Sequence, residues 1–205
     1  MSDREWTAIH EAAHAAMAFT VKRSIEVISI APTKHYGGVT IPRTPSMPGG
    51  EPNLFLPAPM QPWPFRRWIE STIMISQAGP AAEYLLRDIP RSPGFLAPDP
   101  DEEYVLSLAR IAAPSPLEAR SLANADKPSP RDELTAMSLG HGIAGDTAVR
   151  YVAWLGQETN RIVVGSRFVR LVDALVPHLL RHTTISGRLA RRVLVAADKE
   201  YSHGS

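Results

Sequence analysis

The chain has 205 residues, of which 44% are hydrophobic, and this size and composition favour one substantial core in a single domain. Lysine and arginine (22) nearly balance aspartate and glutamate (21), so the net charge of +1 gives no electrostatic reason to expect a nucleic-acid or anionic-membrane partner. The absence of cysteine excludes disulfides and restricts the ligands of any zinc site to histidine and carboxylate.

The first predicted element is an alanine-rich helix. Ser2 followed three residues later by Glu5 has the spacing of a capping box. From Asp3 to about Lys22 no glycine or proline interrupts the chain. We therefore expect a helix over residues 3–22, and this helix carries the most specific motif of the sequence, HEAAH at residues 10–14.

Two short strands are predicted after this helix. Isoleucine and valine dominate residues 25–31, which predicts a strand that ends at Pro32. Residues 37–42 (GGVTIP) predict a second strand, joined to the first by a hairpin across residues 33–36. Prolines and glycines then recur every few residues over 43–64, which blocks regular structure, so we expect a long exposed loop there.

Helices are predicted for much of the remaining chain. Their expected ranges are residues 65–87, 101–112, 146–182 and 186–199. Gly79-Pro80 is expected to bend the first of them, and Gly165 or Pro177 to break the third. The fold class predicted is mainly α (α+β): a helical bundle, with its C-terminal helical part at about 146–199 and a small β-hairpin or sheet beside the HEAAH helix.

The HEAAH motif has the spacing of a zinc site. On a helix, His10 and His14 point the same way to within about 40°, so two imidazoles can hold one ion. Glu11 lies about 100° further round, where a carboxylate reaches a water on the metal, as the general base of a metalloprotease does. The pattern predicts a zinc cofactor with Glu11 as the catalytic base. The alternative is a chance occurrence of HEAAH on an alanine-rich helix.

Two histidines and a water leave one coordination position for another oxygen or nitrogen ligand. Composition does not choose among the side chains that could fill it. The candidates are Asp99, Asp101, Glu102, Glu103, His35, His141 and Glu83.

Five stretches, in this order, resemble the peptidase domain of the FtsH-type metalloproteases. They are HEAAHA (10–15), VISIAPTKHYGGVTIP (27–42), QAGPAAEYLL (77–86), DEEYVLSLAR (101–110) and LVDALVPHLLRHTTISGRLARRVL (171–194). The resemblance implies one FtsH-like metallopeptidase domain over residues 1–205. It also implies that the third zinc ligand is Asp101, because Ala109 and Arg110 follow it at the family's offsets of eight and nine residues. Asp99 is the alternative, with a different helical phase.

The resemblance also implies how substrate binds. Gly37, Gly38, Val39 and Thr40 would lie on an edge strand beside the cleft, where an extended polypeptide adds through backbone hydrogen bonds. The structural alternative is an ordinary hairpin whose glycines form the turn. Glu83 would accept a hydrogen bond from a zinc-binding imidazole and so orient it, or else be a glutamate unconnected with the metal.

The chain departs from the family at several points. Ala13 replaces the usual glycine of the zinc motif, and Pro80 stands where the family usually has arginine. The sequence contains no G-x-x-x-x-G-K-[ST] phosphate loop and no apolar run near the roughly 18 residues that cross a bilayer. We therefore expect a soluble, cytoplasmic, ATP-independent endopeptidase acting on unstructured polypeptides, unless a separate ATPase unfoldase delivers folded ones. Ring assembly of relatives leaves a homo-oligomer open.

Other histidines show weaker patterns than this motif. His178 and His182 are also four apart on an expected helix, but no glutamate follows His178. His141, in a glycine-flanked loop, is expected to be solvated. A competing function is a catalytically inactive, peptidase-like protein that acts through protein–protein interaction, and a third is a purely structural zinc site closed by a fourth protein ligand.

Overall fold

The structure is a computed structural model. It describes residues 1–32, 37–43, 63–86 and 147–203. In these ranges the chain forms five helices and one small antiparallel sheet, so the predicted mainly helical α+β class is confirmed at that level. The described residues belong to two compact units, one with residues 1–32, 37–43, 74–86 and 158–203 and the other with residues 63–73 and 147–157.

The helix α1 (Asp3–Thr20) confirms the first predicted element. The side chain of Ser2 accepts a hydrogen bond from the Glu5 amide, and the Glu5 carboxylate accepts one from the Ser2 amide at 2.6 Å, so the capping box is formed. The inner face of α1 is built mostly of small side chains that are fully buried, namely Ala8, Ala12, Ala13, Ala15, Ala16 and Ala18. Because alanine is small, neighbouring elements can approach the α1 backbone closely.

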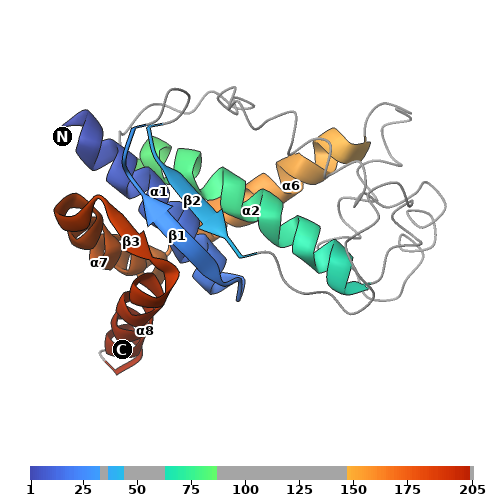
Figure 1. Ribbon diagram of the computed structural model, residues 1–205. Helices are drawn as coiled ribbons and strands as arrows, with labels where there is room; N and C mark the ends of the chain where they lie inside the picture. The colour runs from blue at the N-terminus through green and yellow to red at the C-terminus, as the bar shows by residue number, and fades with distance from the viewer. Residues whose placement is uncertain (33–36, 44–62, 87–146, 204–205) are drawn as a thin grey trace. The chain divides into compact units, whose positions relative to one another are not determined.

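A three-stranded antiparallel sheet packs against α1 (Figure 1). The central strand is β1 (Ile25–Ser29), with β2 (Val39–Pro42) on one side and β3 (Thr184–Ser186) on the other. Both predicted strands are confirmed, the first ending two residues earlier and the second starting two residues later than expected. The hairpin expected at 33–36 lies outside the described residues, and β3 was not predicted. Thr40 and Pro42 are partly buried, and Val39 and Ile41, which alternate with them along the strand, are exposed.

The later helices follow the predicted pattern. They are α2 (Trp63–Leu86), α6 (Thr147–Val163), α7 (Ser166–His182) and α8 (Gly187–His203). Pro80 lies inside α2, and Pro177 inside α7. The predicted break falls at Gly165, which is the N-cap of α7. Most of the expected proline-rich loop and the whole expected helix at 101–112 lie outside the described residues.

The core of the first unit joins α1 and β1 to α7 and α8. Its largest fully buried side chains are Met17 of α1, Ile28 of β1, and Leu171, Leu175, Leu179 and Leu194 of the two C-terminal helices. At Gly187 a side chain would overlap the backbone oxygen of Ile25, so α8 starts in direct contact with β1. This packing fixes α1, and with it the HEAAH motif, between the sheet and α7. No helix among the described residues is both long and apolar enough to span a membrane.

Candidate metal centre

The two histidines of the motif meet through their Nε2 atoms. His10 Nε2 and His14 Nε2 lie 2.9 Å apart, and the rings are nearly perpendicular, with an interplanar angle of 80° and centroids 4.5 Å apart. One helical turn between the residues produces this arrangement, as the sequence spacing predicts. The structure therefore brings the two imidazoles together.

The opposite nitrogen of each ring contacts a hydrogen-bond acceptor supplied by α2. His14 Nδ1 lies 2.6 Å from the backbone oxygen of Ile75, and His10 Nδ1 lies 3.1 Å from Oε1 of Glu83. A carbonyl oxygen and a carboxylate only accept, so each Nδ1 carries the proton. In the neutral imidazole this leaves both Nε2 atoms unprotonated, and their lone pairs face each other.

His14 is held in the neutral form. Burial lowers the pKa of His14 from its ordinary value of 6.5 to about 3, and the neighbouring His10 lowers it further, against a smaller opposite effect of the hydrogen bond to Ile75. At neutral pH the Nε2 atom of His14 is therefore a free electron-pair donor. Neutral imidazole nitrogen is the form that binds transition metals.

At Gly79 the backbone of α2 leaves no room for a side chain beside the histidine pair. A Cβ atom at this position would lie 2.6 Å from Nε2 of both His10 and His14, closer than real Cβ contacts. One face of α2 supplies all three features, because the residues concerned are spaced four apart. They are Ile75 with its carbonyl oxygen, Gly79 with no side chain, and Glu83 with its carboxylate. The sequence predicted a bend at Gly79-Pro80 but not this contact with the histidines. The available signal was the spacing of four residues between Gly79 and Glu83.

Glu11 is buried beside the pair and held by β2. Only 5% of Glu11 is exposed, and Oγ1 of Thr40 lies 2.6 Å from its Oε2 and 3.1 Å from its backbone oxygen. Burial raises the pKa of the Glu11 carboxyl group, while the hydrogen bond from Thr40 and the proximity of His10 lower it by less. Near Gly38 the approach is equally tight, because a Cβ there would lie 2.8 Å from Oε1 of Glu11.

The structure brings some of the predicted site residues together and leaves others outside its description. Glu83 lies at Nδ1 of His10, which places it behind the ring rather than at the Nε2 atoms. Gly37 and Val39 are exposed, and Gly38 and Thr40 are partly buried. The described residues contain no group of three or more histidine, cysteine, aspartate and glutamate side chains that could hold a metal. The remaining predicted ligands lie outside the described residues: Asp101, and its alternatives Asp99, Glu102, Glu103, His35 and His141.

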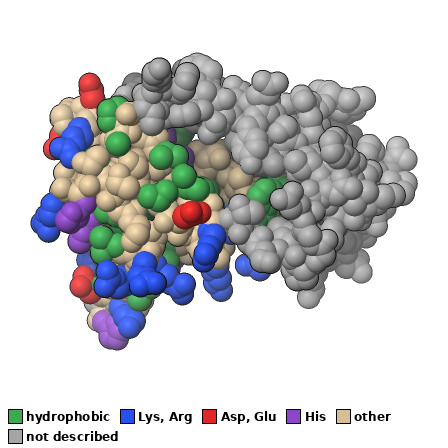
Figure 2. Space-filling view, viewed as in Figure 1, with side chains coloured by type: hydrophobic (Ala, Val, Ile, Leu, Met, Phe, Trp, Pro, Cys, Tyr) green, Lys and Arg blue, Asp and Glu red, His purple; other side chains and the backbone are tan. Residues whose placement is uncertain are grey.

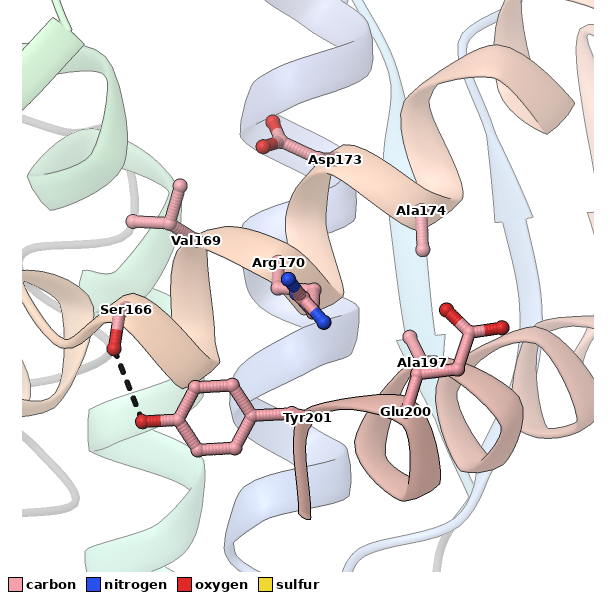
Figure 3. Close-up of a pocket in the computed structure, with 8 residues that line it drawn as sticks. All are labelled: Ser166, Val169, Arg170, Asp173, Ala174, Ala197, Glu200 and Tyr201. Carbon is pink, nitrogen blue, oxygen red and sulfur yellow. Dashed lines mark hydrogen bonds between the residues drawn. The ribbon is translucent and has the colours of Figure 1, made fainter. Parts of the chain in front are cut away.

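A shallow hollow lies elsewhere, between α7 and α8 (Figure 3). The Tyr201 hydroxyl and Oγ of Ser166 are 3.1 Å apart, and the Arg170 guanidinium lies 5.9 Å from the centre of the Tyr201 ring. These contacts link the start of α7 to the end of α8 and are those of a helix interface. The histidine pair does not line this hollow, and the candidate site remains at His10 and His14.

The C-terminal helices are basic on their outer surface. Figure 2 shows lysine and arginine side chains gathered in the lower part of the view, where α8 lies. Arg188, Arg191 and Arg192 of α8 are exposed, as is Arg181 of α7. Arg167 forms an ion pair with Asp198, with Nε and Oδ1 2.6 Å apart. The surface therefore combines solvated cations with at least one cross-helix pair.

No model of a known protein family matches the chain, and no curated protein matches it. The function is therefore inferred from the chemistry of the site itself. That chemistry consists of two imidazole Nε2 atoms 2.9 Å apart and a buried carboxylate from the same helical turn.

Proposed function

We propose that the chain is a zinc-dependent metallopeptidase that hydrolyses peptide bonds in unstructured polypeptides. His10, His14 and Asp101 would hold zinc, and Glu11 would be the general base. The proposal includes a single FtsH-like domain over residues 1–205, with Gly37, Gly38, Val39 and Thr40 beside the substrate.

One observation carries the proposal: the Nδ1 protons of both histidines are already engaged. Each Nδ1–H donates to its own acceptor on α2, so two Nε2 lone pairs meet at 2.9 Å. Two lone pairs at this distance repel each other unless a proton or a metal cation lies between them. A chance HEAAH on a solvated helix would not need acceptors behind both rings.

The donor set fits zinc. Imidazole nitrogen and carboxylate oxygen are both ordinary zinc ligands, and two zinc–nitrogen bonds of about 2.0–2.1 Å easily span two nitrogens 2.9 Å apart. The carboxylate of Glu83 behind His10 is the outer partner that raises the basicity of a metal-binding imidazole. When bound, zinc would supply a Lewis acid that lowers the pKa of water to about 7.

Glu11 has the surroundings of a proton carrier. Its carboxylate is buried one residue after a proposed ligand, and burial raises its pKa. A base with a raised pKa can take a proton from water during attack on the peptide carbonyl and return it to the departing amine. Removal of this one carboxylate should therefore abolish turnover while leaving the metal ligands in place.

The edge of the sheet supports a polypeptide substrate. In the described sheet β2 is an edge strand, and the outer side of an edge strand is where an extended polypeptide can add through backbone hydrogen bonds. Val39 and Ile41 are 38% and 42% exposed, so they offer apolar contacts to a neighbouring extended chain. Glu11 lies directly behind this strand, next to Gly38 and Thr40.

The proposal is tested by metal analysis and proteolysis of the same preparations. Purified protein should hold about one zinc per chain and cleave casein, and a chelator should stop cleavage. Glu11→Gln should keep the zinc and lose at least about 100-fold in kcat, since general base catalysis contributes about 10²–10⁴-fold. The matched control is Glu26→Gln, an exposed glutamate on β1, which should change neither.

The possible outcomes separate the candidate functions. Full cleavage by Glu11→Gln would refute the assigned mechanism. Zinc retention without cleavage of any flexible protein or peptide library would instead support a non-catalytic, peptidase-like binding protein. Loss of zinc from His10→Ala and His14→Ala, with the helix content unchanged, would show that the motif itself holds the metal.

A further inference from the structure

We propose that Thr40 is a positioning residue for Glu11: its hydroxyl group fixes one carboxylate oxygen so that the other is presented to the reacting water. This inference rests on the proposed role of Glu11 as general base. It assigns to Thr40 a task distinct from contact with substrate.

The direction of the Thr40 side chain comes from the alternation of β2. Val39 and Ile41 are exposed, whereas Thr40, between them, is partly buried. Side chains on a strand alternate between its two faces, so Thr40 turns toward α1 while its neighbours turn to solvent. The pairing of Thr40 with Ile28 of the central strand fixes this register.

The contact itself is short and directional. Oγ1 of Thr40 lies 2.6 Å from Oε2 of Glu11, within the range of a charge-assisted hydrogen bond from hydroxyl to carboxylate. The same Oγ1 atom is 3.1 Å from the Glu11 backbone oxygen, so the hydroxyl group contacts both the side chain and the main chain of Glu11. Among the described residues, Thr40 is the group that donates a hydrogen bond to this buried carboxylate.

The two oxygens of Glu11 have different surroundings. Oε2 accepts from Thr40, whereas among the described residues no group donates a hydrogen bond to Oε1. Gly38, two residues before Thr40, leaves just enough room for Oε1, because a Cβ there would lie 2.8 Å from it. Anchoring at Oε2 with a free Oε1 is the arrangement that a general base needs.

A kinetic comparison of two substitutions tests the inference. Thr40→Val keeps the β-branched shape and removes the hydroxyl group, whereas Thr40→Ser keeps the hydroxyl group. Misplacement of a catalytic group can cost about 10²-fold, so we expect Thr40→Val to lower kcat on the order of 10- to 100-fold, with KM and zinc content unchanged. Thr40→Ser should restore most of the activity. The matched control is Thr184→Val, which removes a hydroxyl group from the opposite edge strand.

A stability measurement tests the contact without turnover. In metal-free protein, loss of a hydrogen bond to a buried carboxylate should lower the Tm of Thr40→Val by about 3–10 °C. In a Glu11→Leu background the same substitution should cost less than half as much, since the acceptor is gone. Equal Tm losses in the two backgrounds would show that Thr40 does not act through Glu11.

The failure of this inference can be told apart from the failure of the proposed function. Wild-type turnover that depends on Glu11, together with an unchanged kcat in Thr40→Val, would overturn the inference alone. A raised KM with equal losses in Thr40→Val and Thr40→Ser would make Thr40 a substrate contact and also overturn it. If the wild type cleaves nothing, the proposed function fails, and the Tm comparison still decides whether Thr40 holds Glu11.

Discussion

Two histidine pairs of this protein share one spacing and differ in everything else. His10 and His14 on α1 and His178 and His182 on α7 are each four residues apart on a helix. Behind the first pair, both Nδ1 atoms have acceptors on α2. Behind the second, neither imidazole has a hydrogen-bond partner among the described residues, and His182 is exposed.

The comparison shows that spacing brings two imidazoles together but does not make a metal site. Without such acceptors the imidazoles of the α7 pair can rotate and take either tautomer, so their nitrogens are not aimed at one point. The α1 pair has its rings held from behind and its tautomers set by fixed acceptors. What distinguishes the two is therefore the face of α2, with Ile75, Gly79 and Glu83.

The substitution with the largest expected effect closes the space between α2 and the α1 pair. In Gly79→Ala, the new Cβ would lie 2.6 Å from both Nε2 atoms, so the rings must move or α2 must retreat. We expect zinc affinity to fall by more than the 10- to 100-fold that loss of an outer-shell partner typically costs. Competition with a chromophoric chelator measures this loss.

The controls for Gly79→Ala separate the site from the fold. Ser76→Ala, on the same helix, should leave zinc affinity unchanged. The double substitution His178→Ala/His182→Ala should leave the zinc stoichiometry at its wild-type value. Zinc affinity of Gly79→Ala equal to that of wild type would mean that α2 does not face the metal, and the distinction between the two pairs would collapse.

A smaller effect is expected from the acceptor behind His10. Glu83→Ala removes the group that holds Nδ1–H, so zinc affinity should fall by about 10- to 100-fold. Glu83→Gln keeps an acceptor oxygen without the charge and should lose less. Both variants are compared with the exposed-site control Glu26→Gln by the same competition assay. If Glu83→Ala binds zinc as wild type does, the hydrogen bond to His10 has no part in the site.

These contrasts also show which parts of the fold were predictable from sequence. The helix α1 was predicted because its signals are local: a capping box at Ser2 and an uninterrupted alanine-rich run. The strand β3 was missed because three residues are too few for an alternating pattern. It becomes a strand only through pairing with β1, more than 150 residues earlier in the chain. That information is tertiary and is absent from the segment itself.

The residues of the candidate site also differ in whether the sequence alone could predict them. His10, Glu11 and His14 were found by spacing, because helix geometry alone places them together. The acceptor at Ile75 could not be found, since it is a backbone carbonyl that any residue would supply. Thr40 was assigned to substrate contact, and its hydrogen bond to Glu11 follows only from the register of β2 on β1. The residues that aim the ligands are thus harder to predict than the ligands.

The smallest expected effect concerns stability and pH in metal-free protein. Folding lowers the pKa of His14 from 6.5 to about 3, so below about pH 6.5 the unfolded chain takes up a proton that the folded chain does not. This contribution is complete above pH 6.5 and is lost as the pH falls toward 3. It corresponds to at most about 2 kcal/mol between pH 7 and pH 5.

Glu11 acts in the opposite sense, because its pKa is raised on folding, and its stabilising contribution exists at low pH and is lost as the pH rises through the folded pKa. Comparison of wild type with His14→Gln cancels this term, since both proteins keep Glu11. Urea denaturation at pH 7 and pH 5 should show a greater loss of unfolding free energy for wild type than for His14→Gln. Parallel losses would mean that burial on α1 does not hold His14 in the neutral form, and the contrast between the two histidine pairs would lose this support.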